Sequence, residues 1–169
     1  MCLIRPENPT DHAAIRHVHT LAFGQPNEAD LVDALRHHQA LTLSLVAVQD
    51  HRLVGHIAFS PVSIVSATTT HDALGLGPMG VLPTHQRQGI GSQLVESGLQ
   101  ACRDIGCRVV VVLGHPHYYP RFDFTPAKPY GIIWQHDAPE EAFMVRELQE
   151  GMLAQTRGVV KYRPEFDAV

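Results

Sequence analysis

A glutamine and two glycines between an apolar strand end and an apolar helix pattern are the best candidates for chemistry in this chain. The segment from Gln86 to Gly91 follows the apolar residues Met79 to Val81, and apolar residues at helical spacing begin at Ile90. Gly89 and Gly91 lack a Cβ, so a phosphate oxygen can approach the main-chain N–H groups. The unpaired N–H groups and the positive dipole end of the following helix would face that anion. The pattern therefore predicts a pyrophosphate site.

Two other phosphate loops do not fit this segment. A nucleotide triphosphate loop needs Gly-Lys-Ser/Thr, which is absent here, and Leu94 stands where a dinucleotide fingerprint has its third glycine. What remains is Gln-x-x-Gly-x-Gly between a strand and a helix.

This pattern resembles the acyl-CoA loop of the GCN5-related N-acetyltransferases (GNAT), in which Arg/Gln-x-x-Gly-x-Gly/Ala follows the fourth strand. A second segment, Gly114 to Pro126, resembles the part of that family that carries Tyr-x-x-x-Gly-Phe. Here Tyr119 stands five residues before Phe124, and Asp123 replaces the usual glycine. Two further segments, 54–62 and 143–148, resemble the YhbS-like branch of the family, and the resemblance extends over most of the chain.

The resemblance implies that the chain binds acetyl-CoA. The pyrophosphate would lie on main-chain N–H groups of the loop, with added positive charge from Arg87, and the pantetheine arm would contact the end of the fourth strand. That strand would bulge near Gly77-Pro78 and splay from the fifth. The expected cofactor-binding residues are Met79, Gly80, Val81, Gln86, Arg87, Gln88, Gly89, Ile90, Gly91, Ser92 and Tyr119.

The resemblance also suggests two catalytic residues, Tyr119 and Glu28. A phenol with a pKa of about 10 can protonate a thiolate whose conjugate acid has a pKa of about 8.5, so Tyr119 is expected to protonate departing CoA. In the family the two early helices shape the acceptor side, where Glu28 could bind or deprotonate an amine. Packing beneath the cofactor is the alternative for Tyr119, and stabilisation of its own helix is the alternative for Glu28. His56 and His115 are lower choices for the base.

The expected reaction is transfer of the acetyl group of acetyl-CoA to a primary amine of a small molecule, by direct attack in a ternary complex. Two alternatives stay open: an acetyltransferase acting on proteins or peptides, and a catalytically silent acyl-CoA-binding regulator. A homodimer is an expectation from the family alone.

The elements needed to position these residues can be read from apolar spacing, caps and turns. The first predicted helix has Ile15, Val18, Leu21 and Ala22 on one buried face and stops at Gly24. The expected fold is α/β, with a mixed, mostly antiparallel sheet of about six to seven strands, flanking helices and a single domain over residues 1–169. Strands are expected near 3–4, 41–48, 53–65, 73–81, 107–113, 130–134 and 142–148, and helices near 10–23, 27–38 and 90–105.

Composition limits the partners. A net charge of −4 over 169 residues, without a run of Lys and Arg, argues against nucleic acid and membrane surfaces. Three cysteines in no paired spacing indicate free thiols, and the N-terminal residues do not look like a targeting signal, so a cytoplasmic protein is expected. Twelve histidines lack a matching cluster of acids or cysteines, so no metal is expected.

Overall fold

The computed structural model describes residues 1–169, which form two compact units. Unit 1 comprises Met1–Ser60, Gly77–Ala101 and Pro164–Val169, and unit 2 comprises Pro61–Leu76 and Cys102–Arg163. Two long strands, β3 and β4, run through both units. The helices are α1 (His12–Phe23), α2 (Asn27–His37) and α3 (Ile90–Asp104), and the strands are β1 (Cys2–Pro6), β2 (Leu43–Gln49), β3 (Arg52–Val65), β4 (Thr70–Val81), β5 (Val109–Leu113), β6 (Thr125–Pro126), β7 (Ile132–Trp134), β8 (Phe143–Glu147) and β9 (Gly158–Lys161).

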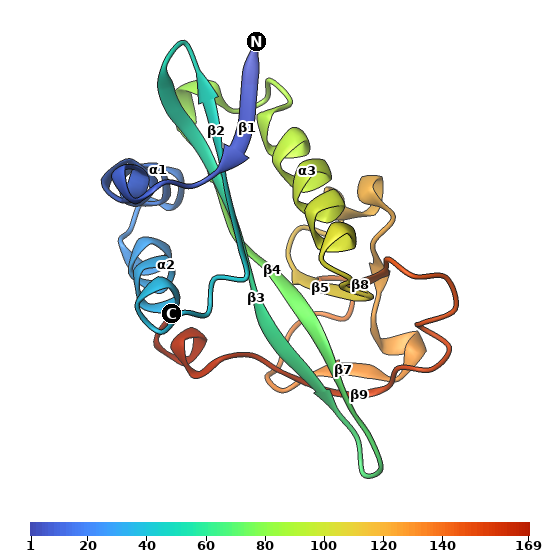
Figure 1. Ribbon diagram of the computed structural model, residues 1–169. Coiled ribbons are helices and arrows are strands. Elements are labelled where there is room, and N and C mark those ends of the chain that lie inside the picture. Colours follow the sequence, from blue (N-terminus) through green and yellow to red (C-terminus); the bar gives the residue numbers. More distant parts are fainter. The chain divides into compact units, whose positions relative to one another are not determined.

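Unit 1 is built on the strand order β1-β2-β3-β4. β1 and β3 both pair antiparallel with β2, and the β2–β3 register shifts between Ala47 and Val48. Leu82, just after β4, donates its N–H to the carbonyl of Val54 at 2.8 Å. Helices α1 and α2 lie on one side of β2 and β3, and α3 lies on the other (Figure 1).

The alternation of side chains along β3 explains this arrangement of helices. His56 faces α1, where its ring meets His19. Gly55 and Phe59 face the opposite side, where a Cβ at Gly55 would lie 3.0 Å from Leu94 of α3 and a Cβ at Gly98 would lie 2.5 Å from the ring of Phe59. A bare backbone at these two glycines therefore lets α3 pack closely on the strand.

The two early helices begin and end at the signals in the sequence. α1 follows a short 3-10 turn at Pro9–Asp11 and ends at Gly24, whose φ of 70° is the left-handed conformation typical of a helix C-cap. Arg16 of α1 reaches across to Asp30 and Asp33 of α2, at 2.6 and 2.8 Å.

Unit 2 holds the strand order β4-β5-β8-β6, and β9 pairs with both β3 and β7. β5 runs parallel to β4, with Leu74 opposite Val110, and antiparallel to β8. The four valines of β5 are buried, as expected for an inner strand. The core of the unit consists of Val62, Ile64, Ala73, Val109, Val111, Ala127, Ile132, Phe143, Val145, Met152 and Val160.

The mixed, mostly antiparallel sheet is confirmed, but it contains more strands than expected. β4–β5 and β7–β9 are parallel, and β1–β2, β2–β3, β3–β9, β5–β8 and β6–β8 are antiparallel. The sheet has nine strands rather than six to seven. The two strands that were not predicted are β6, which has only two residues and includes Pro126, and β9, a four-residue run whose partners are distant in the sequence. Such short strands depend on their neighbours and leave little periodic signal.

The first helix also differs from the prediction at one position. Leu21 is 46% exposed, whereas His19 is fully buried together with Ile15 and Val18. The buried face of α1 therefore includes His19, and it does not include Leu21, which the spacing of apolar residues had placed there.

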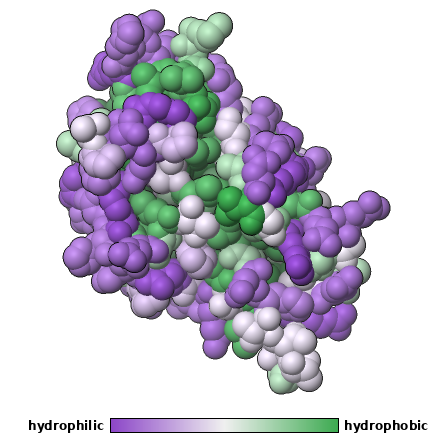
Figure 2. Space-filling model, viewed as in Figure 1, coloured by the Kyte–Doolittle hydropathy of each residue, from purple (hydrophilic) through white to green (hydrophobic).

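On the face shown in Figure 2, hydrophobic residues (green) gather in patches with hydrophilic residues (purple) around them. Leu3 of β1 and Leu21 and Phe23 of α1 are among the exposed large hydrophobic residues. None of the helices combines the length and the hydrophobicity needed to span a lipid bilayer.

Candidate functional site

The loop before α3 adopts a backbone conformation suited to an anion. It leaves a 3-10 turn at Pro83–His85 and passes through Gln86, which is extended. Arg87 and Gly89 then have φ values of 62° and 84°. Positive φ is uncommon for a residue such as arginine, and turns of this kind direct successive N–H groups into a concave nest.

The side chain of Gln86 braces this loop. Its Nε2 donates to the carbonyl of Val81 at 3.0 Å and so links the loop to the end of β4. The side chain of Gln88 reaches back to the carbonyl of Thr84 at 3.5 Å. The glutamine of the Gln-x-x-Gly-x-Gly pattern therefore has a visible structural role, which is to hold the loop backbone in place.

The loop and the first turn of α3 fit a pyrophosphate. The N–H of Gln93 bonds to the carbonyl of Gly89 at 3.1 Å, and the N–H groups that precede it in a helix have no carbonyl within the helix to bond. A Cβ added at Gly89 would meet no atom within 4 Å, so the space above this residue is open. Residues 86–89 are exposed to solvent. An anion can therefore reach the N–H groups at the positive end of the helix dipole.

The end of β4 packs against α1 at Gly80. A Cβ at Gly80 would lie 3.1 Å from Nδ1 of His19 and 3.2 Å from the Cβ of Ala22. Gly80 and Val81 are buried, and Met79 is half-buried. The three residues expected to contact pantetheine thus lie in unit 1 with the loop.

Tyr119 lies in unit 2, in a short 3-10 turn at Tyr119–Phe122. Its ring covers Gly114, where a Cβ would be 2.4 Å from the ring, and makes an edge contact with Tyr118 at 5.1 Å between centroids. Burial raises the pKa of the Tyr119 phenol, so the group is protonated at neutral pH and holds its proton more tightly than an exposed phenol does.

Asp123 preserves the turn in which the family has glycine. It closes the 3-10 turn with φ 64° and ψ 22°, a left-handed conformation that glycine adopts without strain and that aspartate tolerates. The carboxylate is 3.7 Å from the guanidinium of Arg146. The substitution therefore leaves the geometry of the turn intact.

Glu28 occupies the first turn of α2 in unit 1 and is half-buried. Its two carboxylate oxygens accept hydrogen bonds from Nε2 of Gln25, at 3.1 and 3.2 Å. The Glu28 carboxylate is therefore hydrogen-bonded to the residue just before α2, which gives it a structural role there. A role in catalysis stays a prediction.

The sequence analysis missed a buried polar chain behind β4. Nε2 of His19 is 2.7 Å from Nδ1 of His56, and Nε2 of His56 is 2.8 Å from the hydroxyl of Ser44. Ser44 in turn donates to Glu7 at 2.6 Å. His56 was considered as a base, but His19 was not, since a histidine on an otherwise apolar helix face gives no periodic signal of its own.

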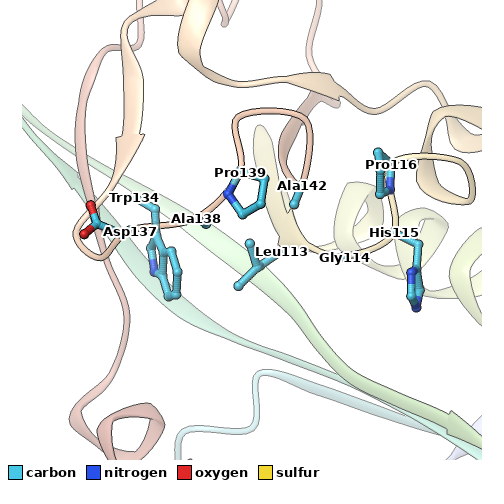
Figure 3. A pocket seen from close by; sticks show the side chains of 9 residues that line it. All are labelled: Leu113, Gly114, His115, Pro116, Trp134, Asp137, Ala138, Pro139 and Ala142. Carbon is cyan, nitrogen blue, oxygen red and sulfur yellow. The ribbon is translucent and has the colours of Figure 1, made fainter.

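Unit 2 contains a pocket of about 540 Å³, shown in Figure 3. Leu113 and Trp134 supply apolar surface, and His115 and Asp137 supply titratable groups at its border. The lining residues are Leu113, Gly114, His115, Pro116, Trp134, Asp137, Ala138, Pro139 and Ala142. No cluster of three or more His, Cys, Asp or Glu side chains that could hold a metal ion occurs in the structure.

Comparison with known proteins places these features in a family. The model of the acetyltransferase (GNAT) domain matches residues 3–127. YhbS of Escherichia coli K12, described as an uncharacterized N-acetyltransferase, is 35% identical over 166 residues, which cover 98% of each chain. YjhQ of the same organism, described in the same way, is 37% identical over 138 residues and 76% of each chain.

Solved structures agree with this placement. E. coli YhbS in complex with CoA superposes with a TM-score of 0.93 at 35% identity, over 98% of this chain and 92% of that one. A GNAT family acetyltransferase from Brucella melitensis in complex with acetyl-CoA has a TM-score of 0.81 at 40% identity, over 99% of each chain. The loop pattern, the sheet and these matches over nearly the whole length show that the chain belongs to the GNAT family of N-acetyltransferases.

Proposed function

We propose that this protein transfers the acetyl group of acetyl-CoA to a primary amine of a small molecule, by direct attack in a ternary complex. The observation that carries the proposal is the loop of residues 86–92, with left-handed Arg87 and Gly89 in front of the first turn of α3. The relatives whose structures contain CoA and acetyl-CoA support it.

The proposed cosubstrate contacts all lie on unit 1 except one. Main-chain N–H groups of Gln86, Arg87, Gln88, Gly89, Ile90, Gly91 and Ser92 bind the pyrophosphate, and the exposed Arg87 side chain adds positive charge. Met79, Gly80 and Val81 contact the pantetheine arm. Tyr119 is also a proposed cosubstrate contact, and it protonates the departing thiolate.

An open pocket of unit 2 has a size that suits a small molecule. Its volume of about 540 Å³ lies within the range of about 300 to 1,000 Å³ common for small ligands. Leu113 and Trp134 offer an apolar and aromatic surface, which suits the apolar body of a small molecule. Glu28 is the proposed acceptor-side acid. A peptide acceptor and a silent acyl-CoA-binding regulator are the alternatives.

Three wider properties belong to the same proposal. The chain acts as one domain over residues 1–169 and works in the cytoplasm, where its cysteines Cys2, Cys102 and Cys107 stay free thiols. A homodimer is the proposed assembly, and β1, at the edge of the sheet in unit 1, is the strand that would pair with a second copy.

The test is release of CoA thiol from acetyl-CoA in the presence of polyamines, amino acids, aminoglycosides or lysine peptides. Thiol release with one class of free amine, together with an acetylated product of matching mass, supports the proposal. Preference for peptides selects the protein acetyltransferase. Tight acetyl-CoA binding without thiol release from any amine selects the regulator.

The role of Tyr119 is tested in the same assay. Tyr119→Phe keeps the ring that covers Gly114 and removes only the hydroxyl. We expect turnover at saturating substrates to fall by about 10- to 100-fold while the KM for acetyl-CoA changes little. Tyr118→Phe, a half-buried neighbour in edge contact with the same ring, is the matched control. Full turnover in Tyr119→Phe would reduce the residue to a packing role.

A further inference from the structure

Four side chains of unit 1 form an unbroken line of hydrogen bonds from the interior to a half-buried carboxylate. His19 of α1 and His56 of β3 are both 0% exposed, and their rings meet edge to face. From His56 the line continues through Ser44 of β2 to Glu7, with successive distances of 2.7, 2.8 and 2.6 Å. The guanidinium of Arg36 in α2 donates hydrogen bonds to both carboxylate oxygens of Glu7, at 3.0 and 2.9 Å.

The direction of every hydrogen bond in this line follows from the carboxylate at its end. An ionised Glu7 only accepts, so the hydroxyl of Ser44 donates to it, and the Ser44 oxygen must accept from Nε2–H of His56. Burial lowers the pKa of both histidines, and the imidazoles are therefore neutral. Neutral His56 then has a bare Nδ1, which accepts from Nε2–H of His19.

This leaves Nδ1 of His19 as a bare lone pair. The atom is buried and has no hydrogen-bond partner in the protein. It faces β4 at Gly80, where even a Cβ would come within 3.1 Å of it. Gly80 is the middle residue of the segment for which we proposed contact with pantetheine. A buried acceptor without a donor is unfavourable, so its presence here calls for a ligand or a function.

We propose that Nδ1 of His19 takes up the proton that the acceptor ammonium must lose, directly or through one water, and that His56 and Ser44 pass this charge to Glu7. The inference rests on the proposed acetyl transfer and assigns its general base. It replaces Glu28, whose carboxylate is engaged by Gln25, in that role.

The proton transfers balance along the line. The ammonium gives one proton to Nδ1 of His19, Nε2–H of His19 passes to Nδ1 of His56, Nε2–H of His56 passes to Ser44, and the hydroxyl proton of Ser44 passes to Glu7. The freed amine lone pair forms the C–N bond to the acetyl carbon, the C–S bond breaks, and sulfur leaves with its electron pair. The phenol of Tyr119 gives its proton to the departing thiolate, and the second proton of the attacking nitrogen restores the phenol.

Glu7 is a suitable exit for the proton. Its burial raises the pKa of the carboxyl, but hydrogen bonds from Arg36 and Ser44 outweigh this and hold the pKa below its usual value. After the acetyl group has been transferred, the proton held at Glu7 is therefore released to solvent, and the side chain is 16% exposed. The other charged groups near the line are His12, 3.7 Å from Glu7, and Asp33, which pairs with Arg36 at 2.9 Å.

Two variants separate this role from a structural one. In His19→Gln the side-chain amide can still donate to His56 but offers no basic nitrogen, and we expect kcat to fall by about 100-fold with an unchanged KM for acetyl-CoA. His17→Gln, an exposed histidine on the same helix, is the matched control and should keep wild-type kcat. Ser44→Ala interrupts the line beyond His56 and should lower kcat by about tenfold.

The pH profile provides a readout that packing alone would not change. With a proton kept on the protein in the transition state, kcat/KM for an amine of pKa about 10 should be nearly flat from about pH 6 to about pH 8. The His19→Gln variant can use only amine that is already deprotonated. Its kcat/KM should therefore decrease about tenfold for each unit by which the pH is lowered over the same range. Parallel profiles for the two proteins would overturn the proposal.

Nitrogen-15 NMR of the histidines tests the line without turnover. We expect His19 and His56 both to carry their proton on Nε2 at neutral pH, and a proton on Nδ1 of either ring would overturn the relay. If the wild type acetylates no amine, the proposed function fails and the relay fails with it. If the wild type acetylates an amine and His19→Gln does so equally fast, only the relay fails.

Discussion

The free energy of unfolding of this protein should decrease as the pH is lowered below about 6.5, because the fold holds His19 in its neutral form. Burial, followed by the field of Arg36, lowers the pKa of His19 from 6.5 to about 4. The unfolded chain therefore takes up this proton first as the pH falls. Well above pH 6.5, His19 does not lower the free energy of unfolding. As the pH falls from 6.5 to about 4, His19 lowers the free energy of unfolding by an increasing amount.

The size of the effect follows from the two pKa values. At about pH 5 an unfolded histidine is almost fully protonated and His19 is almost fully neutral, so His19 alone lowers the free energy of unfolding by about 2 kcal/mol relative to about pH 7.5. Burial also lowers the pKa of His56, which adds a loss of the same sign. Carboxylates contribute little in this interval because most of them stay ionised in both states.

The assay is urea unfolding of the wild type and His19→Gln at these two pH values. The glutamine does not titrate and keeps the donor to His56, so the variant should lose about 2 kcal/mol less than the wild type between the two conditions, with an unchanged m-value. Equal losses in the two proteins would show that His19 is not held neutral by the fold, and would refute the reasoning.

Three further predictions concern the rest of the chain. Gly98→Ala should lower the free energy of unfolding by about 1 to 2 kcal/mol, because its Cβ would lie 2.5 Å from Phe59 at the contact between α3 and β3; a higher Tm would contradict this close packing. Asp123→Gly should raise stability by up to about 1 kcal/mol, since it relieves a left-handed aspartate whose side chain is 85% exposed, and a fall in Tm measured by circular dichroism would show that the carboxylate is needed. A single domain should unfold in one calorimetric transition whose van't Hoff and calorimetric enthalpies agree, whereas two resolved transitions would show two domains.

Much of the fold could be predicted because strong local signals agree with it. Gly24 ends α1, the valine run of β5 is an inner strand, and the loop before α3 lies between β4 and the helix as the sequence indicates. The short strands β6 and β9 were missed because pairing partners far along the chain create them.

The polar line from His19 to Glu7 could not be predicted for a related reason. Its members come from α1, β3, β2 and the segment between β1 and the first 3-10 turn, so no spacing in the sequence connects them. His56 was named only as a lower choice for the base, and the meaning of His19 on the apolar face of α1 depends on what the folded chain places opposite it.

The most direct test of the central claim is calorimetric titration of the protein with acetyl-CoA, compared with two glycine variants. Gly89→Glu puts a carboxylate where the pyrophosphate is expected to lie. Gly106→Glu is the matched control, since it has nearly the same φ, 83° against 84°, and the same open surroundings after the other end of α3. We predict tight binding to the wild type and to Gly106→Glu, and loss of binding to Gly89→Glu with its circular dichroism spectrum unchanged. Equal binding by the two variants, or no binding by the wild type, would contradict the assignment of this loop to acetyl-CoA.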